Sequence, residues 1–158
     1  MVDEKSTREE IIQEYKADVD KLLRYIPWLE SKVGVRVVNT YENSDLISGS
    51  LTVPVYESTL MSFIKEARNT KLIERNYNYA YSKYRIRNSE DEKHLIANCK
   101  LLEIDILKAI LSRYIMQGMT KSRVWSEGVE NRVFLLVLLK LKELLEFWDK
   151  PLAYGRLD

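Results

Sequence analysis

Residues 75–87, RNYNYAYSKYRIR, combine two kinds of side chain that bind nucleic acids or acidic proteins. Four tyrosines fall within eight residues, and arginine or lysine lies on either side of them. Aromatic rings beside a positively charged groove form a surface on which bases stack. The same cations can dock on an acidic protein. We therefore identify seven candidate partner-binding residues: Arg75, Tyr79, Lys83, Arg85, Arg87, Lys121 and Arg123.

The spacing of the tyrosines also fits the buried face of a helix. Tyr77, Tyr81 and Tyr84 share with Ala80 the i, i+3, i+4, i+7 pattern of one helical stripe, and only Tyr79 points clearly outward. The alternation of Tyr77, Tyr79 and Tyr81 is compatible with a strand as well. We favour core packing of the rings over a partner surface or base stacking, and we assign any function to the neighbouring cations.

Residues for enzymatic chemistry are sparse, so we predict no catalytic residue, metal ligand or cofactor. His94 is the only histidine, and Cys99 lies roughly 140° from it around a helix. Glu103 and Asp105, a possible acid–base pair, point to different sides of a helix. No glycine-rich phosphate loop is present. An enzyme built from carboxylates, tyrosine and arginine is left open as a third hypothesis.

The composition predicts one mainly α domain over 1–158, with flexible tails at 1–6 and 149–158. Hydrophobic residues make up 46% of the chain, and only 5 Gly and 3 Pro leave little room for the turns of a strand-rich fold. The longest apolar run, VFLLVLL, is much shorter than the roughly 20 residues of a membrane span. The polar start is unlike a signal peptide, and the single cysteine favours the cytoplasm.

About five helices are expected around one core. The first begins at a Thr7–Glu10 capping box and is kinked or ended by Pro27, and the second begins near Ser58. The tyrosine segment forms the third. The remaining two are expected at 89–117, opened by a capping box at Ser89 and closed by a left-handed Gly118, and at 131–148, with a short helical piece at Trp125 between them.

Residues 33–56 differ in character, because they combine β-branched residues with glycines and a polar cluster. We expect an irregular connection or two short strands there, VRVV and SLTVPV. Pro54 would restrict the second strand to an edge. Two isolated strands are marginally stable unless they pack on helices.

Charge is unevenly distributed along the chain although the net charge is +1. Residues 1–30 carry eight acidic and five basic side chains, whereas residues 65–87 carry seven basic and two acidic ones. Residues 106–125 add four basic side chains and no acid. Such zoning can guide association with an oppositely charged partner.

Four segments occur in an order that resembles a family of small bacterial proteins known as a domain of unknown function. They are LLRYIPWLES, GSLTVPVYESTLMSFIKEA, IDILKAILSRYI and VWSEGVENRVFLLVLLKLKELL. The resemblance covers about three quarters of the chain and lies mostly in the hydrophobic pattern. The family tends to have charged residues where this chain reads QGMTKSRVW, so any role of that stretch does not transfer. The resemblance implies no activity.

These observations predict a non-enzymatic protein-interaction module that docks through the basic Tyr/Arg-rich segment 75–87. Its partner would be another protein, which includes the acidic N-terminal segment of a second copy in a homodimer. The alternative is a weak, salt-sensitive nucleic-acid-binding protein that uses the same cations. No membrane association is expected.

Overall fold

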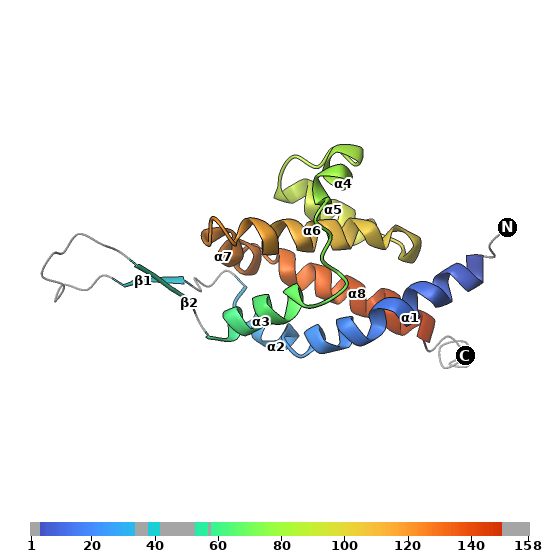
Figure 1. Cartoon of the computed structure of the whole chain (residues 1–158), viewed down its shortest axis with the longest axis horizontal. Coiled ribbons are helices and arrows are strands. Elements are labelled where there is room, and N and C mark those ends of the chain that lie inside the picture. The colour runs from blue at the N-terminus through green and yellow to red at the C-terminus, as the bar shows by residue number, and fades with distance from the viewer. Residues whose placement is uncertain (1–3, 34–37, 42–52, 57, 150–158) are drawn as a thin grey trace, which may run out of the picture.

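The computed structural model describes residues 4–33, 38–41, 53–56 and 58–149, and it is mainly helical (Figure 1). The described residues form eight α-helices, one 3-10 helix and two strands. The helices are α1 (Glu4–Leu23), α2 (Ile26–Ser31), α3 (Ser58–Arg68), α4 (Tyr77–Lys83), α5 (Ser89–Asn98), η1 (Leu101–Glu103), α6 (Ile104–Gln117), α7 (Arg123–Glu130) and α8 (Val133–Asp149). None of these helices combines the length and apolar character that a bilayer span requires.

Helix α8 lies at the centre of the core because its N-terminal half is apolar on nearly every side. Val133, Phe134, Val137 and Leu138 are fully buried. Helices α1, α2, α5, α6 and α7 all pack against α8. This arrangement is expected of a helix that lacks a polar face.

Strands β1 (Val38–Tyr41) and β2 (Val53–Tyr56) pair antiparallel, with Val38 opposite Tyr56 and Tyr41 opposite Val53. The predicted VRVV strand overlaps β1 only at Val38, and its first three residues lie outside the described ranges. Figure 1 shows the two strands extending away from the helices.

The expected count of five helices is wrong because two predicted helices are interrupted and the short piece expected at Trp125 is a helix in its own right, α7. The first ends at Leu23, and Pro27 lies in the first turn of α2, where its missing amide hydrogen costs nothing. The helix expected at 89–117 breaks between α5 and α6. There Cys99 and Lys100 are extended, and the Glu103 side chain accepts a hydrogen bond from the Lys100 amide at 3.1 Å.

Three predicted caps also differ from the structure. Thr7 lies inside α1 rather than at its start. Helix α5 is capped by Asn88, whose Oδ1 accepts a hydrogen bond from the Asp91 amide at 2.9 Å, so Ser89 is not its N-cap. Gly118 is right-handed, with φ −65°. Its lack of a side chain is explained by Trp125, because a Cβ at Gly118 would lie 2.1 Å from the indole ring.

Candidate functional site

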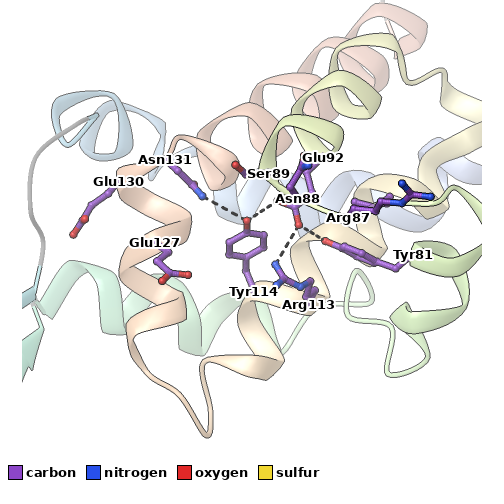
Figure 2. Close-up of a pocket in the computed structure, with 11 residues that line it drawn as sticks. Tyr81, Arg87, Asn88, Ser89, Glu92, Arg113, Tyr114, Glu127, Glu130 and Asn131 are labelled. Atoms are coloured by element: carbon purple, nitrogen blue, oxygen red, sulfur yellow. Dashed lines mark hydrogen bonds and ion pairs between the residues drawn. The ribbon is translucent and has the colours of Figure 1, made fainter.

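A pocket of about 540 Å³ opens between the α4–α5 connection, α6 and α7 (Figure 2). Helices α4, α5, α6 and α7 supply its walls, together with the α4–α5 connection and the residue that follows α7. Ten of its eleven lining residues carry a polar or charged group, so the pocket is suited to hydrogen bonding. The lining residues are Tyr81, Ile86, Arg87, Asn88, Ser89, Glu92, Arg113, Tyr114, Glu127, Glu130 and Asn131.

The floor of the pocket is a hydrogen-bond network centred on the Glu92 carboxylate. Glu92 is only 2% exposed. Its Oε2 accepts hydrogen bonds from the Tyr81 hydroxyl at 2.7 Å and from Arg113 Nη1 at 3.2 Å. Its Oε1 accepts one from the Tyr114 hydroxyl at 2.5 Å. Figure 2 shows these side chains converging from α4, α5 and α6. The carboxylate therefore joins three helices.

The local sequence explains why Glu92 points inward. Asn88 and Arg87 precede α5, and both are tied to Asp91: the Asn88 side chain caps the Asp91 amide, and the Arg87 amide donates to Asp91 Oδ2 at 2.9 Å. Asp91 is thus fixed at the outer side of the first turn. Glu92, one residue further on, is rotated by about 100° toward α6.

The two tyrosines at the floor act as hydrogen-bond donors. Burial, followed by the nearby Glu92 carboxylate, raises the pKa of Tyr81 well above its usual range. Burial and the hydrogen bond to Glu92 raise the pKa of Tyr114 likewise. Both hydroxyls therefore keep their protons near neutral pH, and the network is suited to fixing shape rather than to exchanging protons.

Arg113 completes the floor by contacting both rings. Its guanidinium lies 5.6 Å from the centre of the Tyr81 ring and 5.1 Å from that of Tyr114. Burial lowers the pKa of Arg113, but the Tyr81, Glu92 and Tyr114 side chains outweigh it and the net pKa is raised. Arg113 is therefore a permanent cation that compensates Glu92 at the pocket floor.

All seven predicted partner-binding side chains are exposed. Arg75, Tyr79, Lys83 and Arg85 lie on or beside α4, and Arg87 lines the pocket. The other two cations lie at the start of α7, and the structure does not join them to the first group. Lys121 comes just before α7, and the Arg123 Nε lies 3.8 Å from Glu127 Oε2.

The tyrosines divide as their spacing predicts. Tyr79 is 64% exposed, whereas Tyr77, Tyr81 and Tyr84 are partly buried. Tyr81 and Tyr84 pack against the hydrophobic core, and Ala80 is buried. Tyr77 instead contacts the Tyr81 ring edge-on, with 6.3 Å between the ring centres. The helical interpretation of this segment is confirmed, and the strand alternative is wrong.

Arg85 adopts a backbone conformation that arginine seldom takes. Its φ is 55°, in the left-handed region, and it ends α4 in a Schellman motif. The Ile86 amide donates to the Tyr81 carbonyl at 2.9 Å, and the Arg85 amide donates to the Ser82 carbonyl at 3.3 Å. Glycine is the usual residue at this position because it has no Cβ. This motif turns the chain into the pocket wall at Ile86.

Several pocket residues were not recognised from the sequence. Glu92 was interpreted as a capping residue, and Arg113 was not assigned a role at the floor. One signal was available: Ser112 and Arg113 interrupt the apolar run of α6, and a polar pair in such a run indicates a buried polar cluster. Ser112 is indeed fully buried and accepts a hydrogen bond from the Glu74 amide at 2.7 Å.

The two residues considered for nucleophilic chemistry lie outside the pocket lining. His94 is exposed on α5, and Cys99 is buried directly after the end of that helix, so the two do not share the one continuous helix that the sequence predicts. Burial, with a smaller effect of Glu103, raises the pKa of the Cys99 thiol to about 12. A thiol with that pKa is a poor nucleophile at neutral pH.

No protein-family model, curated protein or solved structure matches this chain. The resemblance to a family of bacterial proteins therefore stays a prediction. The fold and the site define the chain as a mainly helical protein with an exposed cationic segment beside a polar pocket.

Proposed function

We propose that this protein is an interaction module that docks an acidic segment of a partner protein on the cationic surface of α4, which we define as Arg75, Tyr79, Lys83, Arg85 and Arg87. None of the four cations forms an ion pair with another residue of the described ranges. Apart from the contact of the Lys83 ammonium with the Tyr84 ring at 5.2 Å, their charge is left for a partner, and Tyr79 adds an exposed ring of the kind that anchors interfaces. We propose the cytoplasm as the compartment.

The observation that carries this proposal is the left-handed conformation of Arg85. A non-glycine residue in this conformation is less stable by about 1 kcal/mol, and glycine would avoid that penalty. The exposed Arg85 side chain contributes no ion pair within the described part of the chain that would offset it. The Schellman motif needs the left-handed conformation but does not need an arginine side chain, and strained residues of this kind cluster at functional positions.

An acidic protein is a better partner for this surface than nucleic acid. Stacking along a single strand requires a series of exposed rings. Tyr79 is the one tyrosine of α4 that is mostly exposed. In addition, Glu127 and Glu130 line the wall of the pocket on the side away from Arg87, where they would repel a phosphate backbone that continued toward Lys121 and Arg123 (Figure 2).

The test compares labelled ligands of equal charge by fluorescence anisotropy: a peptide of Asp, Glu and Tyr, and single- and double-stranded DNA and RNA of mixed sequence. We expect salt-sensitive binding of the peptide. Changing Arg75, Arg85 and Arg87 together to Ala should weaken it by about tenfold or more, since exposed ion pairs contribute up to about 1 kcal/mol each. The exposed Lys142 on α8 provides the control, and Lys142→Ala should bind as the wild type does.

Arg85→Gly separates binding from stability. We expect this variant to be as stable as the wild type or about 1 kcal/mol more stable, and to bind the acidic peptide about two- to fivefold more weakly. Unchanged binding would contradict the proposed role of Arg85. Tighter binding of nucleic acid than of the peptide would replace the proposal with the nucleic-acid alternative. Self-association in sedimentation that the triple variant abolishes would identify the partner as a second copy.

A further inference from the structure

The charges that line the pocket are separated across it. Figure 2 shows Arg87 on one side and Glu127 and Glu130 on the other, with Tyr114 and Arg113 between them. The Arg87 guanidinium forms no ion pair with the described residues. The Arg113 charge is compensated by Glu92 at 3.2 Å. The pocket thus has a cationic end at Arg87 and an anionic end at Glu127 and Glu130. The charges of its floor compensate each other.

At the anionic end, the Glu127 carboxylate can exchange its ion pair with Arg123 for an ion pair with a ligand. Glu127 is paired with Arg123 at 3.8 Å, and both side chains are more than half exposed. Such a pair contributes little stability because water screens both charges. An ammonium group that enters the pocket beside Glu127 would therefore compete with a weak interaction.

The polar groups between the two ends are already oriented. The Asn88 side-chain oxygen accepts a hydrogen bond from the Asp91 amide, and that of Asn131 accepts one from the Val133 amide at 3.1 Å. These bonds orient the two amide groups and leave hydrogen-bond donors on their nitrogen atoms. The Asn131 nitrogen lies 3.5 Å from the Tyr114 hydroxyl. A floor fixed in this way lowers the entropic cost of binding a small polar molecule.

The pocket is less suited to a polyanion. Glu90 and Asp91 occupy the first turn of α5, close to Arg87, and their charges oppose a second negative group there. A single carboxylate, by contrast, fits the planar fork of one arginine. The volume of about 540 Å³ is within the range of small-molecule sites.

We infer that this pocket binds a small zwitterion of the amino acid or short peptide class, with its carboxylate at Arg87 and its ammonium group at Glu127. The inference does not depend on the proposed docking surface. Arg87 belongs to both sites, whereas the rest of the cationic surface of α4 lies outside the pocket lining and the zwitterion would sit within the pocket. Arg85 belongs to the first site alone, and Glu127 to the second alone.

The test records amide NMR spectra of the full chain with glycine, 4-aminobutanoate, 6-aminohexanoate, diglycine and triglycine, and with butanoate and butylamine as ligands that carry one charge. We expect at least one zwitterion to bind and to shift the signals of Ser89 and the side-chain amides of Asn88 and Asn131. The spacing between charges in the tightest ligand distinguishes a free amino acid from a peptide.

Charge variants of the two ends provide the decisive comparison. Arg87→Met retains the aliphatic stem and Glu127→Gln retains the shape, and each should weaken zwitterion binding by about tenfold or more, as expected for loss of a hydrogen bond to a charged group. Arg85→Met removes a neighbouring exposed charge outside the pocket lining and should leave zwitterion binding unchanged. The reciprocal double variant Arg87→Glu with Glu127→Arg should bind again, with the ligand reversed.

Three outcomes would overturn the inference. The first is the absence of any shift at the pocket with every zwitterion at about 10 mM, a concentration that detects even millimolar affinity. The second is equal binding of butanoate or butylamine, which would show that one charge suffices. The third is equal loss in Arg85→Met and Arg87→Met, which would indicate a diffuse charge effect. Each can occur whether or not the acidic peptide binds on α4.

Discussion

At the scale of single residues, Glu92 has the most connected side chain of the pocket. Its carboxylate accepts hydrogen bonds from Tyr81, Arg113 and Tyr114, so α4, α5 and α6 are held together at one point. A buried acceptor surrounded by donors is costly to alter, because each donor that loses its partner stays desolvated. Glu92 therefore stabilises the fold in addition to lining the pocket.

We predict that Glu92→Gln lowers the free energy of unfolding by about 2–3 kcal/mol. The amide nitrogen of Gln cannot accept a hydrogen bond, so at least one donor is orphaned and the Arg113 charge loses its counter-ion. The estimate is at the low end for a buried ion pair because Arg113 is 33% exposed. Urea denaturation measures the change. The exposed Glu90 on the same turn supplies the control, and a Glu90→Gln effect of equal size would contradict this account.

The two tyrosines of the floor predict how stability depends on alkaline pH. Their pKa values are raised in the folded state, so folding favours the protonated hydroxyls. This stability is complete below the unfolded pKa of about 10 and is lost as the pH rises toward the folded values, at up to about 1.4 kcal/mol per pH unit for each tyrosine. Chemical denaturation between about pH 9 and 11 should show a shallower decline for Tyr81→Phe than for the wild type. Identical slopes would refute this assignment.

At the scale of elements, α7 is held by close approaches at two glycines. Gly118 precedes it and touches Trp125, whose indole nitrogen donates to the Ile115 carbonyl at 3.0 Å. Gly128 lies within α7 and touches the ring of Phe134, the second residue of α8. Because α7 supplies Glu127 and Glu130 to the pocket, these contacts fix the position of the anionic end of the pocket.

We predict that Gly128→Ala is destabilising although alanine is the better helix former by about 1 kcal/mol. A Cβ at this position would lie 2.6 Å from the Phe134 ring, which is fully buried and cannot move away. Overpacking of this kind costs about 1–3 kcal/mol. Thermal unfolding of the variant measures the balance. A rise in the unfolding temperature would mean that α7 can move to accommodate the Cβ. The contacts at Gly128 would then not fix the position of the anionic end.

At the scale of the whole molecule, α8 connects the other helices into one core. Leu138 is fully buried on it. We predict that Leu138→Ala lowers the free energy of unfolding by about 2–5 kcal/mol, which is the range for a large-to-small change in a packed core. Unfolding followed by tryptophan fluorescence and by far-ultraviolet circular dichroism should retain one common midpoint. Two separated midpoints would show that the helices do not unfold as one unit.

The hydrophobic pattern predicted the helical class and the outward Tyr79. It did not predict the break at Cys99 and Lys100, because neither is a helix breaker and the break is stabilised by the Glu103 side chain. The candidate cations were recognised, but the pocket was not. Its floor joins residues from α4 to α6 through tertiary packing, which spacing along a sequence does not reveal.

The packing of α1 on α8 has a consequence for how the protein is made. These two helices contact each other although about 110 residues separate them along the chain. During synthesis α1 leaves the ribosome long before α8 exists, so the part of its apolar stripe that packs on α8 has no native partner until α8 is translated, although α3 and η1 are made earlier. The core can close only after α8 has been translated. Until then, chaperones that bind nascent chains would bind that stripe.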